Sequence, residues 1–288
     1  MAAVAACVRG KMGACAHLSR PAHFMVEAAT LKNTAGRAWR LLAVRLGLIL
    51  VVTLVIWLII RATSGIESFP PSTTWATLGL LPVNVLCLVM VRKFYRDEGV
   101  SLSAALGIQK GRIGRDVLWG LLWLFVLNVP FMAVVAGTVF ALYGSDAPSA
   151  FATIFFDAES SVQMEPALLL VISLVAVVPF MLINAPTEEL VFRGYSLDGI
   201  ASRWGGAAAI LATSLLFGAQ HILFAATVPG MLVYFIAFTV WGLCAAIIVR
   251  RQGRLLPVVI AHWIVNIMMS SPAIILPILQ LSGVIPVF

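Results

Sequence analysis

The sequence predicts an all-α protein, a polytopic transmembrane helical bundle with about seven to eight spans. Of its 288 residues, 61% are hydrophobic and only 11% are charged, and the mean hydropathy is +1.04. Soluble domains carry about 25% charged residues and about 45–50% apolar residues. The chain therefore has too little polar surface for a water-soluble body of this size, and the same apolar excess excludes intrinsic disorder.

The expected spans are the apolar runs long enough to cross a hydrocarbon core of about 30 Å as helices. They cover residues 41–60, 75–91, 117–143, 166–185, 206–226, 231–249, 255–269 and a shorter stretch with two prolines, 273–288. Arg45 interrupts the first run near one end, so we expect its side chain to snorkel to the membrane surface.

Charge is distributed unevenly among the segments outside these runs. The net charge is +7, and Lys and Arg gather in residues 1–40, 92–115 and 250–254, whereas residues 144–165 hold four acids and no Lys or Arg. Basic loops stay on the cytoplasmic side, so we expect a multi-pass protein of the cell membrane with a cytoplasmic N-terminus. Membrane lipids are the expected partners of the basic residues. Nucleic acid is not an expected partner, because no basic stretch carries a known nucleic-acid-binding motif.

These features divide the chain into three parts. Residues 1–40 are expected to form a cytoplasmic N-terminal tail, residues 41–165 N-terminal transmembrane helices, and residues 166–288 a C-terminal transmembrane core. The tail lacks the apolar core of a cleaved signal peptide. Its Arg-rich, acid-poor composition leaves an organellar transit peptide as the alternative.

Ionisable side chains at membrane depth mark function, because they are costly unless paired or hydrated. The first cluster is the pair Glu188 and Glu189, directly after the fourth apolar run. Glu189 and Arg193 are i and i+4 on a helix and can pair, whereas Glu188 is rotated by about 100° and is expected to stay free, as suits a general base. The alternative is a helix start at the membrane surface, with the acids favouring the helix dipole.

Two histidines lie within later apolar runs. His221 follows Phe217 by four residues, and His262 precedes Asn266 by four, so His262 and Asn266 project from one face of a helix. A lone intramembrane histidine is more often a packing residue than a catalyst. Two of them, on different helices that follow the glutamate pair, favour a shared site.

The ordered set EExxxR, FxxxH and HxxxN resembles the CAAX protease and bacteriocin-processing family (CPBP, or Abi) of intramembrane endopeptidases. Here the resemblance covers roughly residues 166–270, and Phe-Arg-Gly at 192–194 is also typical of that family. The resemblance implies an intramembrane endopeptidase that hydrolyses a peptide bond of a membrane-associated peptide or lipidated protein. Residues 166–288 would then be the catalytic core.

The resemblance also implies a role for each motif residue. Glu188 would be the general base and would deprotonate a water molecule together with His221. His262 and Asn266 would donate hydrogen bonds to the developing oxyanion. The supporting residues would be Glu189, Arg193 and Phe217.

Three alternatives stay open. No cofactor is expected, but Glu188, His221 and His262 could form a three-ligand zinc site with an open position. A transporter would also use intramembrane ionisable residues, although the chain lacks the paired repeats of transporters. The third alternative is a non-catalytic immunity protein with the same fold.

The predicted depths of the motif residues disagree unless the fourth helix is longer than its apolar run or is broken. At ~1.5 Å per residue, His221 lies about 22 Å along its run and His262 about 10 Å along its own. The depths agree if residues 190–204 extend the fourth helix, which Pro179 and Pro186 could kink.

Overall fold

The computed structural model describes residues 34–155, 162 and 164–286, and regular structure within them is entirely helical. The predicted all-α class is confirmed. The α-helices are α1 (Thr34–Ser64), α2 (Thr73–Asp97), α3 (Leu102–Leu106), α4 (Ile113–Tyr143), α5 (Ala147–Ile154), α6 (Pro166–Glu189), α7 (Leu197–His221), α8 (Val228–Gln252), α9 (Leu256–Ser270) and α10 (Pro272–Leu281). The shorter segments are η3 (Lys110–Arg112), η4 (Gly144–Asp146), η6 (Leu190–Ser196) and η7 (Ile222–Phe224).

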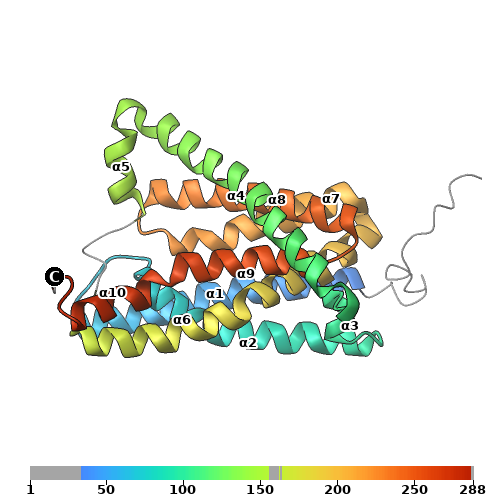
Figure 1. Cartoon of the computed structure of the whole chain (residues 1–288), viewed down its shortest axis with the longest axis horizontal. Coiled ribbons are helices and arrows are strands. Elements are labelled where there is room, and N and C mark those ends of the chain that lie inside the picture. The colour runs from blue at the N-terminus through green and yellow to red at the C-terminus, as the bar shows by residue number, and fades with distance from the viewer. Residues whose placement is uncertain (1–33, 156–161, 163, 287–288) are drawn as a thin grey trace, which may run out of the picture.

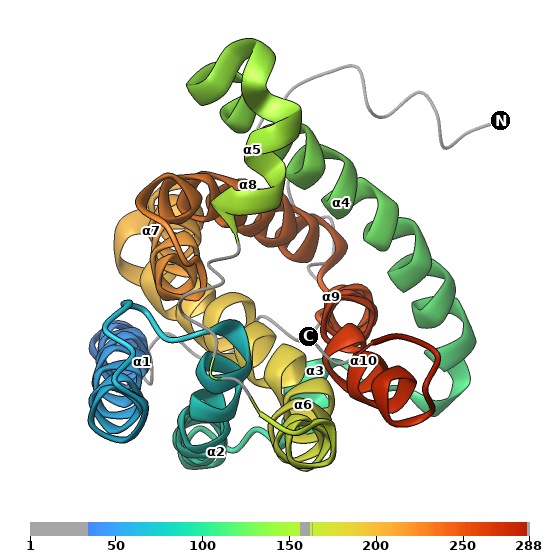
Figure 2. The same ribbon diagram turned by 90° about the vertical axis from the view of Figure 1, so that its left-hand side faces the viewer.

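The long helices lie along the long axis of the molecule, and α4 crosses them diagonally (Figure 1). Seen end-on, α1, α2 and α6 follow one another along one side, α7 lies next to α1, and α8 packs against α7 (Figure 2). The start of α1, the end of α2, the start of α4 and the end of α8 lie at the same end of the bundle (Figure 1). The basic segments at 92–115 and 250–254 are therefore neighbours in space. Residues 1–33 of the predicted tail, 1–40, lie outside the described residues. Residues 34–40 form the first turns of α1.

Six helical segments are long and apolar enough to cross a membrane, fewer than the seven to eight predicted. The count differs because two pairs of predicted spans are not separated by loops. The fourth and fifth lie in one helical run, Pro166–Phe224, which is kinked at Gly205, and the seventh and eighth lie in another, Leu256–Leu281. The helical membrane bundle itself is confirmed.

The predicted extension of the fourth helix is also confirmed. The chain stays helical through Pro179 and Pro186, and a π-helical segment, η6, then joins α6 to α7. The kink lies farther along, at Gly205, where φ is 82° and ψ is 166°. A positive φ is readily adopted only by glycine. The glutamate pair therefore lies within continuous helix, inside the bundle.

The outer surface of the bundle is apolar. Exposed large hydrophobic side chains cover the long helices, among them Leu58 on α1, Val89 on α2, Phe125 on α4 and Val171 on α6. An apolar surface of this extent is unusual for a soluble monomer. It is expected for membrane-spanning helices that face lipid tails. The protein is a multi-pass membrane protein whose polar groups gather inside.

Candidate active site

A fully buried arginine joins four helices at the centre of the bundle. Arg45 on α1 donates from Nε to Gln220 Oε1 at 2.8 Å, from Nη1 to Asn84 Oδ1 at 3.1 Å and from Nη2 to Glu188 Oε1 at 2.6 Å. Asn84 in turn donates to Asn184 Oδ1 at 2.9 Å. The guanidinium thus ties α2, α6 and α7 to α1. The prediction that Arg45 snorkels to the surface is wrong, because the guanidinium finds a carboxylate and two amides inside the bundle.

Glu188 has one anchored and one open carboxylate oxygen. Oε1 accepts from Arg45 and, at 3.1 Å, from Gln220 Nε2. Oε2 is buried without a hydrogen-bond partner among the described residues and lies 3.6 Å from His262 Nε2. The prediction that Glu188 stays free is wrong for Oε1, since the partner of this oxygen comes from 143 positions earlier in the chain. Fixing one oxygen leaves the other pointing toward the histidine.

Glu189 orients the same histidine from its other side. Its Oε1 accepts from Arg193 Nη1 at 3.0 Å, which confirms the predicted i,i+4 pair, and lies 2.9 Å from His262 Nδ1. A carboxylate can only accept here, so the proton of a neutral His262 is on Nδ1. Nε2 then faces Glu188. The two neighbouring glutamates hold one imidazole between them.

His221 is held in a different way. Its Nδ1 lies 2.6 Å from the carbonyl oxygen of Phe217, so Nδ1 carries the proton and Nε2 of the neutral ring is an acceptor. The ring stacks on Phe238, with centroids 3.6 Å apart and an interplanar angle of 6°. The ring of Phe217 contacts both His221 and His262, at centroid distances of 4.7 and 6.2 Å. Phe217 therefore packs against both imidazoles.

Asn266 lies one helical turn beyond His262 on α9. Its side chain is buried, and Nδ2 has no hydrogen-bond partner among the described residues. A buried amide donor without a partner is costly, and such groups in native structures often serve a function. Asn266 is thus a donor available to a bound molecule.

The structure thus places the predicted site residues in one buried region. Direct contacts join Glu188, Glu189, Arg193 and His262, and Phe217 links this cluster to His221 and stacks against Arg193, whose Cζ lies 3.9 Å from the ring centroid. Asn266 follows on the helix of His262. Their roles in a reaction stay predictions.

Sequence reasoning missed four members of this cluster: Arg45, Asn84, Asn184 and Gln220. Each interrupts an apolar run, and that signal was present in the sequence. An arginine at membrane depth is as costly as a glutamate, so Arg45 and Glu188 were candidates for a pair. Nothing in the spacing of residues so far apart indicates which acid the arginine meets.

The zinc-dependent version of the site would need Glu188, His221 and His262 around one ion. Within the described part of the chain, no three or more His, Cys, Asp or Glu side chains are grouped so as to hold one. The guanidinium of Arg45 also lies 2.6 Å from Glu188 Oε1, and its positive charge would oppose a dication at the same carboxylate. The zinc-dependent version through Glu188, His221 and His262 stays an open prediction.

Comparison with protein families identifies the region that carries the motifs. Residues 169–268, about a third of the chain, match the family model described as Type II CAAX prenyl endopeptidase Rce1-like. No curated protein and no solved structure matches the chain. The predicted resemblance to the CAAX protease family is confirmed, and the domain is that of an intramembrane protease. The match includes every predicted site residue, whereas Arg45 and Asn84 lie outside it.

We expect Arg45→Met to destabilise the protein strongly. The substitution leaves Glu188 buried without its countercharge, and breaking a buried ion pair in this way costs about 3–5 kcal/mol. Thermal unfolding of the purified protein in detergent measures the loss. Adding Glu188→Gln to the same chain removes the orphaned charge and should restore part of the stability.

Arg61→Met is the matched control on the same helix. Arg61 pairs with Glu67 at 3.1 Å, but both side chains are at least half exposed. Exposed pairs contribute about 0–1 kcal/mol, so the melting temperature should change little. Equal effects of Arg45→Met and Arg61→Met would contradict the buried network.

Proposed function

We propose that this chain, whose residues 169–268 form a domain of the Type II CAAX prenyl endopeptidase Rce1-like family, hydrolyses a peptide bond of a membrane-associated peptide or prenylated protein through a water molecule activated by Glu188. The observation that carries the proposal is the asymmetry of this carboxylate. One oxygen is held by Arg45, and the other is buried, unpartnered among the described residues and close to His262. A base fixed in this way needs no reorganisation to take a proton.

In the proposed reaction, a water molecule lies beside Glu188 Oε2. Nε2 of neutral His221 accepts a hydrogen bond and orients the same water. The water oxygen attacks the scissile carbonyl carbon while its proton passes to Glu188. The tetrahedral intermediate then collapses, the carbon–nitrogen bond breaks, and Glu188 returns the proton to the leaving amine. Peptide and water are thus converted to a carboxylic acid and an amine with no other reactant.

The oxyanion of the intermediate needs hydrogen-bond donors already in position. Asn266 Nδ2 is supported in this role by its burial and its lack of a partner among the described residues. His262 can donate through Nε2 when its ring carries both protons, with the carboxylates of Glu188 and Glu189 at 3.6 and 2.9 Å as countercharges. Glu189 and Arg193 then act as positioning residues, because they hold the ring and do not touch the substrate.

We also propose that the end of the bundle where α2 and α8 finish faces the cytoplasm of the cell, with the N-terminus on the same side. The basic segments meet at this end, and basic loops are retained on the cytoplasmic side. Anionic lipids of that leaflet are the expected neighbours of the exposed arginines.

Glu188→Gln should reduce the turnover of a farnesylated CAAX peptide by about 10²–10⁴-fold, the usual contribution of a general base. The amide keeps an oxygen for Arg45 but cannot take a proton.

Asn266→Ala should lower kcat by about 10²–10³-fold, as expected for one oxyanion donor. Steady-state kinetics in detergent measure both changes.

Glu67→Gln and Asn128→Ala are the matched controls. Glu67 is an exposed ion-pair partner, and Asn128 only caps a carbonyl within its own helix. Both controls should cleave at the parent rate. If a folded Glu188→Gln protein also does so, Glu188 is not the base, and a non-catalytic immunity or transport function would gain support.

Treatment with a chelator separates the two versions of the mechanism. We expect activity to persist after prolonged exposure to a strong zinc chelator, because the proposed base acts without a metal. The control is a second sample dialysed without chelator. Loss of activity that added zinc restores would favour the zinc-dependent version.

The proposed sidedness is checked by labelling introduced cysteines in sealed inverted membrane vesicles. In a chain whose four native cysteines are replaced by serine, a membrane-impermeant thiol reagent should label Arg251→Cys and not Ser145→Cys, which lies at the other end of α4. The reverse pattern would place the N-terminus outside the cytoplasm.

A further inference from the structure

Helix α8 contributes none of the motif residues, yet it packs against both histidines of the candidate active site. Phe238 stacks on His221, with ring centroids 3.6 Å apart. Trp241 lies three positions later, on the same face of α8. Its ring centroid lies 5.8 Å from that of His262, at an interplanar angle of 63°. One face of α8 therefore forms an aromatic wall beside both imidazoles.

The indole N–H of Trp241 has no acceptor in the described part of the chain. The residue is buried, with 3% of its surface exposed, and Nε1 has no hydrogen-bond partner there. An indole N–H can only donate, and a buried tryptophan usually finds an acceptor for it. The indoles of Trp57, Trp123 and Trp263 each donate to a carbonyl oxygen. The N–H of Trp241 is therefore available to a bound molecule.

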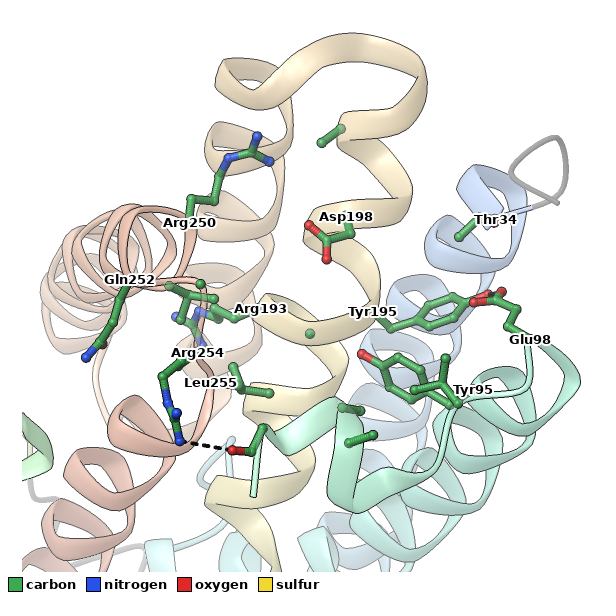
Figure 3. Close-up of a pocket in the computed structure, with 18 of the residues that line it drawn as sticks. Thr34, Tyr95, Glu98, Arg193, Tyr195, Asp198, Arg250, Gln252, Arg254 and Leu255 are labelled. Carbon is green, nitrogen blue, oxygen red and sulfur yellow. Dashed lines mark hydrogen bonds between the residues drawn. The ribbon is translucent and has the colours of Figure 1, made fainter. Parts of the chain in front are cut away.

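Among the side chains that the structure describes, two neutral N–H donors are buried without a partner, and both lie beside His262. They are Trp241 Nε1 and Asn266 Nδ2. Asn266 follows His262 by one turn of α9, whereas Trp241 reaches it from α8. Two charged donors are also unpartnered, Arg193 Nη2 and Arg254 Nε, but they line a cavity of about 500 Å³ at the basic end of the bundle (Figure 3). The lining of that cavity includes neither Trp241 nor Asn266.

A neutral His262 cannot donate to the oxyanion of the proposed intermediate. Its proton lies on Nδ1, toward Glu189, so Nε2 carries none. Asn266 alone would then face the developing charge, whereas oxyanion holes are built from several preorganised donors. The indole of Trp241 is a donor only, so it can supply a second hydrogen bond in either protonation state of His262.

We propose that Trp241 Nε1–H donates a hydrogen bond to the scissile carbonyl oxygen and, together with Asn266, stabilises the oxyanion. The proposal rests on the proposed function and adds to it a catalytic residue from a helix without motif residues. No proton leaves the indole. Its hydrogen bond strengthens as the attacking water makes the carbonyl carbon tetrahedral and negative charge collects on the oxygen, and it weakens when the carbon–nitrogen bond breaks.

A pair of uncleavable peptides tests this contact by binding, without any need for turnover. Both are fluorescent farnesylated CAAX peptides in which a CH₂ group replaces the N–H of the scissile bond. The ketone peptide keeps the carbonyl oxygen, and the ethylene peptide has a second CH₂ group in its place. Fluorescence anisotropy with the full-length protein in detergent measures both dissociation constants. Because the probes are otherwise the same, the ratio of the two constants reports on the groups that contact the oxygen.

Trp241→Phe should lower the ratio of the ethylene-peptide constant to the ketone-peptide constant about fivefold, the expected effect of one hydrogen bond. Phenylalanine keeps an aromatic ring against His262 but has no N–H. Asn266→Ala should lower the ratio in the same way. The matched control is Trp39→Phe, the same change at an exposed indole on α1, and it should keep the parent ratio.

Turnover of the cleavable farnesylated CAAX peptide is the second readout. Trp241→Phe should lower kcat about 10²–10³-fold and change KM less than about threefold, because the lost donor acts in the transition state. Trp39→Phe should keep the parent kcat. If Trp241→Phe does not fold, a benzothienyl side chain at this position replaces the N–H by sulfur in nearly the same shape. The same two results are then expected.

An unchanged ratio in Trp241→Phe would overturn the proposal, whatever happens to kcat. The indole would then only pack against the site, with its N–H directed at a ring such as that of Phe131, whose centroid lies 6.1 Å away. A lower ratio with the parent kcat would also overturn the oxyanion role. A protein that shows the lower ratio but whose parent form cleaves no CAAX peptide contradicts the proposed function alone.

Discussion

Arg45 carries a positive charge in the centre of a bundle whose outer surface is apolar. The polar side chains of the interior are arranged around that charge. An unpaired guanidinium at this depth would be strongly destabilising, so each of its faces needs a partner. Glu188, Gln220 and Asn84 supply these partners from three other helices. The same contacts that offset the desolvation of Arg45 fix the carboxylate of Glu188. Stability and proposed reactivity thus depend on one ion pair.

The two adjacent glutamates contact different parts of the site. Their side chains leave the helix about 100° apart, so Glu188 turns toward the N-terminal helices and Glu189 toward Arg193 and α9. His262 lies between the two carboxylates and is contacted from both sides. The π-helical segment η6 begins directly after the pair, and such segments occur frequently at functional sites. In the proposed mechanism, one carboxylate reacts and the other positions the imidazole.

The sequence was sufficient for features that depend on local spacing and composition. The helical membrane class, the pair of Glu189 and Arg193 and the extension of the fourth helix follow from apolar runs and from the period of a helix. The site of Arg45 could not be predicted, because its partner lies 143 positions away and packing alone brings them together. The number of spans was wrong because an apolar run does not reveal whether its neighbour continues the same helical segment. The roles assigned to Glu188, His221, His262 and Asn266 stay predictions.

The distance in sequence between Arg45 and Glu188 also constrains how the protein is made. The ribosome delivers α1 to the membrane long before α6 is translated, so the guanidinium enters a nonpolar environment while its carboxylate does not yet exist. Asn84, on the second helix, is the first of its partners to be synthesised, and Gln220 is the last. During biogenesis, the guanidinium of Arg45 is therefore without its carboxylate for a period. An incomplete set of helices, or the insertion machinery itself, must stabilise this charge until α6 and α7 are inserted.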